Sequence, residues 1–213
     1  MPLYTTDALI LRSYKLGESD RLVVFLTRDR GKKRGVAKNA RQSRRRFGGA
    51  LEPLTCGRVG YVEHERRDLV RVDYVELTRS PLSAVDGDAL GYVGYFAELI
   101  DEWAPEADPN ESLFRLGASM VDAIGKGVPI EPLARYFEFW LLRLQGVYET
   151  ADRLSADARA FLSAARTSSP FVLGDLVVST QALRELESAH RALIAKHLEK
   201  DLKSARVLRE IRR

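Results

Sequence analysis

The sequence predicts a two-part α+β protein, in which a small N-terminal β-barrel is followed by an all-α region. Before Ser80, the apolar residues gather in short β-permissive runs that are separated by turn residues. After Ser83, apolar residues recur with the 3.6-residue period of amphipathic helices. The chain has 213 residues, enough for two small domains. We therefore expect one domain at 1–80 and a second, helical domain at 81–213.

Five strands are expected in the first domain, at residues 6–14, 21–27, near 36–38, 57–64 and 69–78. The unbroken apolar run of the second strand predicts burial on both faces. In the fifth strand the apolar phase shifts from Val72 and Tyr74 to Val75, which predicts a β-bulge or the end of the strand. The basic stretch 39–46 is expected to be a loop. Five strands with no helix between them are typical of a small closed barrel, such as the nucleic-acid-binding OB-fold.

Helices are expected throughout the second domain. In order, they are a stripe from Leu90 to Ala104, a helix after an Asn110 cap, a helix after Pro129, a short one near 157–166, one capped by Thr180 and a basic one at 203–211. The helix after Pro129 is apolar over most of its circumference, so it should be central. The helix after Thr180 should bury one side that carries Leu183, Leu186, Leu193, Ile194 and His197.

The composition excludes several classes of protein. No apolar run reaches 18 residues, which excludes a transmembrane helix, and the N-terminus lacks the features of a signal peptide. The single cysteine, Cys56, excludes an intrachain disulfide and a multi-cysteine zinc site. We therefore expect a soluble cytoplasmic protein with no membrane partner.

Charge is distributed unevenly along the chain. The net charge of +4 divides into +8 for residues 1–80, −8 for residues 81–150 and +4 for the rest. The peak lies at 28–46, which holds ten cations and one acid, Asp29. Such a density costs stability unless an anion relieves it, so the stretch predicts a polyanion partner. A solvated loop that keeps the protein soluble is the alternative.

The sequence contains no recognisable motif of a catalytic site. The chain has no phosphate-binding GxxxxGK[ST] motif and no GxSxG nucleophile motif. His190 and His197 could share a helix face, but a metal site would need Glu187 or Glu199 as further ligands. Core-edge or surface histidines are the simpler interpretation. We expect a binding protein with no catalytic residue, metal, cofactor or small-molecule substrate.

Aromatic residues beside the barrel strands could stack on bases, because single strands need flat surfaces. These residues are Tyr14, Phe47, Tyr61 and Tyr74. For Tyr61 and Tyr74 a place in the barrel core is favoured. Phe47, between Arg46 and Gly48, is the best stacking candidate, and a core role for it is equally open.

Three sequence blocks resemble the N-terminal region of the bacterial RecO family. They are Ala8-Leu9-Ile10-Leu11 followed by Gly17-Glu18-Ser19-Asp20, then Val36-Ala37-Lys38-Asn39-Ala40-Arg41, then Arg46-Phe47-Gly48-Gly49-Ala50-Leu51-Glu52-Pro53. The end of the chain, Leu202-Lys203-Ser204 followed by Leu208, is also similar to the family. The resemblance implies an OB-fold, a helical domain and a recombination mediator in DNA repair. Such mediators bind single- and double-stranded DNA and anneal complementary strands. With RecR, they help load RecA onto DNA coated by single-stranded DNA-binding protein (SSB).

The resemblance also implies site residues. The DNA contacts would be Arg12, Lys32, Lys33, Arg34, Lys38, Arg41, Arg44, Arg45 and Arg46, with Phe47 beside them. The family binds the acidic, apolar tail of SSB, for which Arg135, Phe139 and Arg143 at i, i+4 and i+8 of one helix could serve. The alternative is that the two arginines pair with Glu131 or Glu138 on the surface.

The sequence departs from the family pattern at two places. Many members carry a four-cysteine zinc module roughly where this chain has residues 146–162. No cysteine lies there, so we expect the module to be absent and leave the structure of 146–178 open. Asn39 stands where glycine is usual, and asparagine tolerates a positive φ better than other non-glycine residues.

Two other function classes remain open beside the mediator. An RNA-binding OB-fold protein, associated with ribosomes or structured RNA, would share the basic stretch and not bind SSB. A nuclease would need clustered acids that hold Mg²⁺ near the basic face, and Asp7, Glu18 and Asp20 are the only nearby group. The mediator, in a bacterial cytoplasm and nucleoid-associated during repair, is the first hypothesis.

Overall fold

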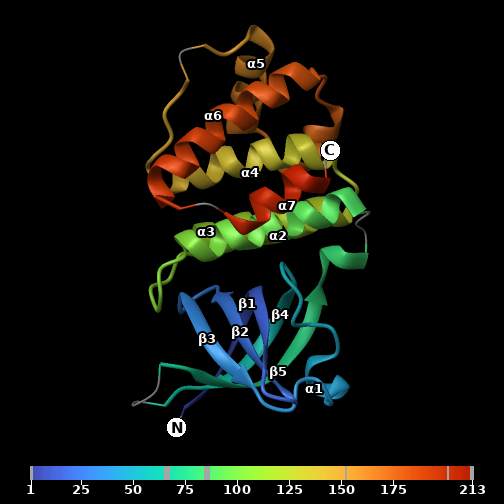
Figure 1. Cartoon of the computed structure of the whole chain (residues 1–213), viewed down its shortest axis with the longest axis vertical. Coiled ribbons are helices and arrows are strands. Elements are labelled where there is room, and N and C mark those ends of the chain that lie inside the picture. Colours follow the sequence, from blue (N-terminus) through green and yellow to red (C-terminus); the bar gives the residue numbers. More distant parts are fainter. Residues whose placement is uncertain (1, 65–67, 84–86, 152, 201, 212–213) are drawn as a thin grey trace.

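A computed structural model describes residues 2–64, 68–83, 87–151, 153–200 and 202–211. Within these residues the strands lie at one end of the molecule and the helices at the other (Figure 1). The expected order, a β part followed by an α part, is confirmed. No helix of the described chain is long and apolar enough to cross a membrane.

Five strands and one short helix make up the barrel. Their bounds are β1 Leu3–Leu16, β2 Asp20–Thr27, β3 Lys32–Ala37, α1 Arg44–Phe47, β4 Cys56–Val62 and β5 Val70–Arg79. The strands close in the order β1-β2-β3-β5-β4, with β3 and β5 parallel and the other pairs antiparallel. A closed five-stranded barrel with this crossover is an OB-fold, so the predicted fold class is confirmed.

Strand β2 is buried on both faces because each face has its own partner. Val23 and Phe25 lie in the core inside the barrel. Val24 and Leu26 belong instead to the core that the barrel shares with the helices. This explains why the sequence of β2 is an unbroken apolar run rather than an alternating one, as predicted.

The bulge predicted in β5 is confirmed. Gly60 pairs with Tyr74, and the next residue, Tyr61, pairs with Val72, so Asp73 is an extra residue in the ladder. The extra residue changes which face the following side chains occupy. As a result Val75 reaches the barrel core, where it is 4% exposed.

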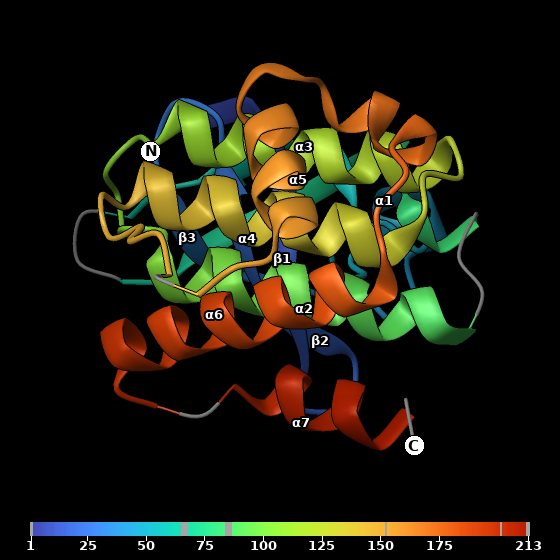
Figure 2. The same cartoon turned by 90° about the horizontal axis from the view of Figure 1, so that it is seen from above.

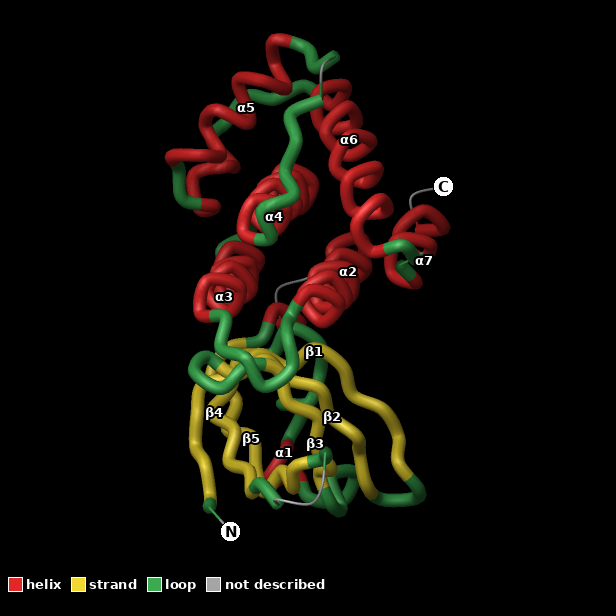
Figure 3. The backbone as a smooth tube through the Cα atoms, turned by 90° about the vertical axis from the view of Figure 1, so that its left-hand side faces the viewer, coloured by secondary structure: helices red, strands yellow, loops and turns green. Residues whose placement is uncertain are grey.

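The helices stack on the barrel in layers (Figures 2 and 3). Two short 3₁₀ helices lie at Pro81–Ser83 and Pro170–Asp175, and the α-helices are α2 Gly87–Trp103, α3 Glu111–Gly125, α4 Ile130–Leu144, α5 Ala156–Thr167, α6 Thr180–Leu198 and α7 Lys203–Ile211. Figure 3 shows α2 and α3 next to the strands, with α4 beyond them. Helix α4 is buried on most sides and is central, as expected.

The barrel and the helices share one continuous apolar core. Leu9 of β1 packs against α3 at Gly117, where an added Cβ would lie 2.6 Å from Leu9 Cδ2. The absence of a side chain at Gly117 therefore lets the helix approach the sheet closely. This shared core fixes which part of the barrel surface the helices cover.

Helix starts and faces agree with the sequence in most details. Asn110 caps α3 by accepting a hydrogen bond from the backbone N–H of Leu113, as predicted. The expected Thr180 cap of α6 is wrong by one residue, because Ser179 accepts from the backbone N–H of Ala182 instead. Leu90 is wrong as a core residue, since it is 52% exposed.

The buried face of α6 differs from the expected one. His197 is exposed, whereas His190 is buried. The buried side chains are Ala182, Leu183, Leu186, His190 and Ile194, which follow the i, i+4 spacing of one helix face. Seven residues place His190 and His197 on the same side of α6, but only His190 is buried, because His197 lies in the exposed last turn.

Candidate nucleic-acid interface

The outer faces of β1, β2 and β3 form a continuous surface on which side chains stand in rows. One row joins Tyr14, Leu22 and Val36, because Tyr14 pairs with Leu22 and Leu22 with Val36. The next row toward the helices joins Arg12, Val24 and Arg34.

The helices cover one end of this surface and leave the other end open. Val24 is only 6% exposed, whereas Tyr14 is 46% exposed. Leu22 and Val36 are half-buried beside Tyr14. An exposed tyrosine between aliphatic side chains, on the β2–β3 side of an OB-fold, offers a flat surface to a base. Tyr14 was one of four candidate aromatics, and the strand register is the signal that selects it.

The basic stretch after β3 folds back against the β1–β2 hairpin. The backbone N–H of Asn39 donates to Asp20 Oδ1 at 2.8 Å, and the backbone N–H of Arg41 donates to the carbonyl of Ser19 at 3.1 Å. Asn39 adopts a φ of +54°, which confirms that asparagine sustains the turn usually made by glycine. The stretch therefore begins next to the open end of the outer sheet face.

Residues 44–47 of the stretch form the helical turn α1, so the expectation of a loop across 39–46 is wrong at this end. Asn39 to Gln42 form a turn, and Ser43 precedes the helix. Five of the predicted DNA contacts are exposed in this part of the barrel: Arg34, Lys38, Arg41, Arg44 and Arg45. We refer to these five side chains as the exposed cation group.

A surface groove of about 540 Å³ lies beside α1. Arg41 and Arg44 line it together with the backbone of Gly48 and Gly49. Arg21 also reaches the groove, but its guanidinium donates to Ser13 Oγ at 3.0 Å and lies 3.5 Å from Glu52 Oε1. Arg41 Nη1 donates to the carbonyl of Glu18 at 2.8 Å, yet its side chain stays exposed. Arg41 and Arg44 are thus placed to hold phosphates along the groove.

Two predicted DNA contacts have other partners. Arg12 Nε lies 2.5 Å from Asp101 Oδ2, and Arg12 Nη2 lies 2.8 Å from Glu102 Oε1. Desolvation would lower the pKa of Arg12, but its hydrogen bond to Tyr14 and the two carboxylates outweigh this and raise the pKa. In this structure the guanidinium therefore joins the barrel to α2, and the role of Arg12 as a DNA contact stays a prediction.

Lys32 is the second predicted DNA contact that has a partner within the protein. Its Nζ donates to the carbonyl of Asp101 at 2.6 Å and lies 3.2 Å from Asp101 Oδ1. The Lys32 backbone is also tied to the helical part, since its N–H donates to Pro105 and its carbonyl accepts from Ala107. The neighbouring Gly31 has a φ of +69°, and a Cβ there would lie 2.4 Å from the backbone nitrogen of Asp108. This junction therefore uses Lys32 as a structural cation.

Lys33 and Arg46 are partly engaged within the barrel. Lys33 Nζ lies 2.7 Å from Glu63 Oε1, and its side chain is 17% exposed. Arg46 donates to Ser43 Oγ at 3.0 Å and to the carbonyl of Lys38 at 2.7 Å. Both can still contribute positive potential to the surface, but neither belongs to the exposed cation group.

Of the two roles left open for Phe47, the structure selects the core. Phe47 is 2% exposed and packs inside the barrel, so the stacking role is wrong for this conformation. The guanidinium of Arg46 lies 5.0 Å from its ring centroid and covers it. Tyr61 is fully buried in the same core, as expected. Tyr74 is half-buried and its hydroxyl lies 3.2 Å from Thr5 Oγ1.

The acids proposed for a nuclease site are not brought together. Asp7 pairs with Arg58 in the middle of the sheet, whereas Asp20 pairs with Leu16 at the tip of the β1–β2 hairpin. Nine residues of β1 separate Asp7 from Leu16, which is about 30 Å along a strand. Across the described ranges, no three His, Cys, Asp or Glu side chains are grouped so as to hold a metal ion. The nuclease hypothesis required these acids to cluster around Mg²⁺, and the described structure does not group them in this way.

Comparison with known proteins identifies the family. The model "Recombination protein O N terminal" matches residues 1–81, and "Recombination protein O C terminal" matches residues 84–153. A DNA repair protein RecO from Geobacter metallireducens is 32% identical over 240 aligned positions, which cover 97% of each chain.

The chain belongs to the RecO family of DNA repair proteins.

Other RecO proteins match over about two thirds of the chain. The protein from Koribacter versatilis is 45% identical over 145 residues, which cover 68% of this chain and 59% of the relative. The protein from Anaeromyxobacter sp. strain K is 40% identical over 153 residues, which cover 71% and 59%. The matches thus span about three fifths of the length of these two relatives.

The three residues expected to bind the SSB tail in this RecO chain do not form one surface. Arg135 and Phe139 are 3% and 1% exposed, whereas Arg143 is exposed. Arg143 lies over the rings of Phe139 and Trp140, about two helical turns from Arg135. Arg135 instead lies 3.0 Å from Glu138, so the alternative pairing is correct in its partner, although the pair is buried rather than on the surface.

Glu138 is the centre of a buried polar network. Glu138 Oε1 accepts from the hydroxyl of Tyr95 at 2.9 Å and contacts Arg135 Nη2, and Oε2 lies 3.1 Å from His190 Nδ1. Burial, the largest cause, raises the pKa of Tyr95, and the carboxylate of Glu138 raises it further. Tyr95 is therefore a neutral donor at physiological pH.

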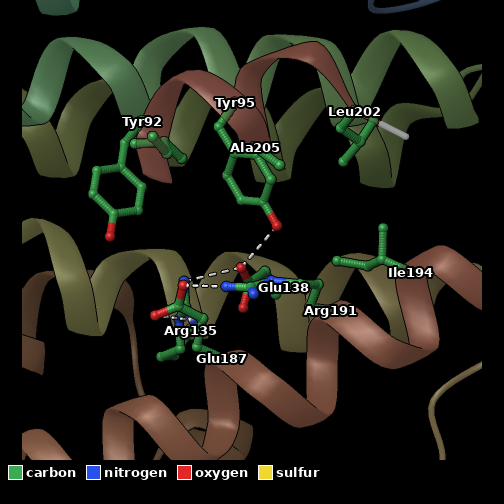
Figure 4. A pocket seen from close by; sticks show the side chains of 10 residues that line it. Tyr92, Tyr95, Arg135, Glu138, Glu187, Arg191, Ile194, Leu202 and Ala205 are labelled. Carbon is green, nitrogen blue, oxygen red and sulfur yellow. Dashed lines mark hydrogen bonds and ion pairs between the residues drawn. The ribbon is translucent and has the colours of Figure 1, made fainter. Parts of the chain in front are cut away.

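A small pocket lies next to this network (Figure 4). Side chains of α2 and α7 face those of α4 and α6 across it. Its apolar residues include Tyr92, Ile194, Leu202 and Leu208, and its floor includes Arg135. Among the described residues, Arg135 Nε is buried without a hydrogen-bond partner, and Arg135 Nη1 lies 3.5 Å from Glu187 Oε2. We call this site the Arg135 pocket.

Proposed function

We propose that this protein is a noncatalytic mediator of recombinational DNA repair that binds single- and double-stranded DNA on its barrel and anneals complementary strands. The observation that carries the proposal is the uncovered row of Tyr14, Leu22 and Val36 beside the exposed cation group. The row offers stacking surface and the cations offer phosphate contacts, the two features on which single-strand binding depends. Membership in a family of DNA repair proteins supports DNA as the polyanion.

Annealing follows from charge neutralisation. Two DNA backbones repel each other, and cations that contact both lower that repulsion and allow bases to pair. The groove beside α1 holds Arg41 and Arg44, while Arg34 lies on the outer face of β3. In our proposal, the sheet face receives one strand through stacking and phosphate contacts, and the groove guides the second backbone. Phosphate contacts of this kind position a strand without specifying its sequence.

Partners follow from the same proposal. The protein would act with RecR to help load RecA onto SSB-coated single-stranded DNA, in a bacterial cytoplasm and at the nucleoid during repair. We place the SSB tail at the Arg135 pocket rather than at Arg143. That pocket combines apolar side chains with a buried guanidinium that has unused donors, which suits a terminal carboxylate next to an apolar residue.

The decisive experiment is annealing of SSB-coated complementary DNA strands. The wild-type chain should accelerate annealing, and the double variant Arg44→Ala/Arg45→Ala should lose most of the acceleration. The matched control is Arg153→Ala/Arg166→Ala, which removes two exposed arginines near or on α5, at the end of the molecule away from the barrel. Equal loss in both variants would show that net charge, rather than this surface, is responsible.

The RNA-binding alternative is less favoured, because the relatives are DNA repair proteins. Competition between DNA and structured RNA of equal charge tests it directly. Stronger binding to the RNA, together with failure to bind an SSB tail peptide, would replace the mediator with an RNA-binding protein.

A further inference from the structure

The C-terminal helix α7 closes one side of the Arg135 pocket with its own apolar residues. Leu202, which directly precedes α7, lines the pocket together with Ala205 and Leu208 of the helix, and Ala205 and Leu208 are neighbours at i, i+3. Leu202 and Leu208 are 9% and 8% exposed. On the outer side of α7, Lys203, Arg206 and Val207 are exposed. The helix therefore makes a one-sided contact with the body of the protein.

The polar contacts that hold α7 come largely from two carboxylates of α2. Glu98 accepts hydrogen bonds from the backbone N–H groups of Lys203 and Ser204 at 3.2 and 2.7 Å, and from the Ser204 hydroxyl. These are the N–H groups at the start of a helix, which have no partner within the helix. Glu102 pairs with Lys200, whose side chain is 51% exposed. Because Lys200 is half-exposed, its pair with Glu102 adds little to the attachment, and the contacts of Glu98, which is 12% exposed, are the main polar attachment of α7.

Beneath α7, donor capacity is left unused. Arg135 Nε is buried and has no hydrogen-bond partner among the residues that the structure describes. A buried polar group without a partner is costly, so a state that supplied an acceptor to Arg135 would be favoured over the closed one. The closed pocket has a volume of about 50 Å³, which admits water but no peptide side chain. A larger ligand therefore requires α7 to move.

We propose that α7, together with Leu202, is a displaceable strap over the Arg135 pocket, and that an acidic, apolar peptide with a free terminal carboxylate binds by displacing it. This inference rests on the partner proposed above for that pocket. Leu202 and Leu208 occupy the apolar surface that the last side chain of the peptide would take. The peptide carboxylate would meet Arg135, and peptide acids would meet Arg191, which lies at the same pocket with its side chain 52% exposed.

The strap also explains why binding would be gated. A site whose competent state is partly populated binds more weakly by that fraction, so removing the strap should tighten binding. The Ser204 hydroxyl donates a hydrogen bond to Glu98, and it does not contact Arg12, which pairs with the carboxylates of α2. Ser204→Ala therefore weakens the strap while it leaves the contacts between the barrel and α2 in place.

Thiol labelling measures the strap directly. Cys56 is the only native cysteine and is buried, so Cys56→Ala gives a background without thiols. In that background Leu208→Cys reports opening, and Val207→Cys, at an exposed position, reports the intrinsic rate. The probe is a synthetic Asp-Asp-Asp-Leu-Phe peptide with a free carboxylate, and its C-terminal amide is the control. We expect the acid peptide to raise the labelling rate of Leu208→Cys at least tenfold, the amide to raise it much less, and Ser204→Ala to raise it severalfold without peptide.

Binding of the same peptide to a chain that ends at Lys200 separates the two proposals. Tighter binding than to the full chain, with unchanged circular dichroism of the remaining helices, supports the strap. Peptide binding that does not accelerate labelling, or that weakens on truncation, overturns the strap and leaves the partner in place. If neither chain binds the peptide, the proposed partner is wrong and displacement by it is excluded.

Discussion

Arg12 Nε of strand β1 lies 2.5 Å from Asp101 Oδ2 of helix α2, so the barrel and the helices are joined by an ion pair as well as by their shared core. Asp101 also forms an ion pair with Lys32, and the neighbouring Glu102 forms ion pairs with Arg12 and Lys200. The carboxylates of α2 therefore neutralise two cations of the basic barrel, Arg12 and Lys32. Arg44 and Arg45, which stay available for a polyanion, lie on α1 at the end of the barrel away from the larger helices (Figure 1).

Arg12→Ala should weaken the fold and leave DNA affinity nearly unchanged. Its guanidinium is 24% exposed and contacts two carboxylates, so we expect a loss of about 1–2 kcal/mol in the free energy of unfolding. Urea denaturation measures this loss, and a salt titration of oligonucleotide binding should show the wild-type slope. A reduced slope with full stability would return Arg12 to the DNA surface.

Arg44→Ala/Arg45→Ala should reduce the salt dependence of single-strand binding. Both side chains are exposed, whereas Arg46 is held by Ser43 and Lys38. Each lost phosphate contact lowers the slope of log K against log salt by about 0.7, so the double variant should lose up to about 1.4. The control Arg153→Ala/Arg166→Ala should keep the wild-type slope. An unchanged slope in the first variant would remove α1 from the interface.

Tyr14→Ala should weaken single-strand binding through stacking rather than charge. Loss of one base–aromatic contact costs about 1–3 kcal/mol of binding free energy, and the salt slope should not change. Tyr14→Phe keeps the ring and should bind within about threefold of the wild type. Fluorescence anisotropy with a labelled oligonucleotide measures both variants. Full affinity in Tyr14→Ala would show that bases do not use the row of Tyr14, Leu22 and Val36.

The sequence was sufficient for the elements of the fold and insufficient for the partners of the cations. The spacing of apolar residues located the strands and helices, because each buried face leaves its own pattern in the local sequence, as in β2 and α4. The partner of Arg12 lies 89 residues away at Asp101, and no local pattern encodes that contact. Charge density alone therefore could not separate Arg12 and Lys32 from Arg44 and Arg45.

The aromatic candidates show the same limit. Phe47 and Tyr14 both neighbour basic residues in the sequence, yet one fills the barrel core and the other is 46% exposed. Strand register places Tyr14 opposite Leu22 on the outer face, and register depends on pairing between strands rather than on either strand alone. At α6, His190 is buried beside Glu138 of α4, whereas the expected His197 is exposed in the last turn of the helix.

Acid should weaken the attachment of α7 through Glu102. Burial would raise the pKa of this carboxyl, but hydrogen bonds and charges from Lys200 and Arg12 outweigh burial and lower the pKa below its ordinary value of 4.5. A carboxyl with a lowered pKa in the folded state stabilises that state above pH 4.5, and this stability is lost as the pH falls through the lower, folded value. Because Lys200 is half-exposed, Glu102→Gln should remove at most about 1 kcal/mol at pH 7.

The free energy of unfolding, measured between pH 3 and pH 7 for wild type and Glu102→Gln, checks this sign. The two curves should converge at the acidic end and separate as the pH rises. Curves that run parallel over the whole range would show that Glu102 titrates alike in the folded and unfolded chains.

Breaking the buried pair between Arg135 and Glu138 should be the most destabilising change of this set. Both side chains are at most 4% exposed, and removing one partner of a buried pair leaves the other charge without compensation. Glu138→Gln keeps the shape of the side chain and should cost about 3–5 kcal/mol of unfolding free energy. Glu131→Gln, a change at a half-buried glutamate near the start of the same helix, is the matched control.

Arg135→Met/Glu138→Gln distinguishes loss of the pair from loss of the wider network. If the cost of Glu138→Gln comes from the unpaired guanidinium, the double variant should recover part of it, because no buried charge remains at that position. Tyr95 and His190 would still lose the carboxylate acceptor, so recovery should be incomplete. Urea denaturation measures the free energy of unfolding of each variant, and an unchanged m-value makes these values comparable. A double variant as unstable as the sum of the two single changes would mean that Arg135 and Glu138 act independently.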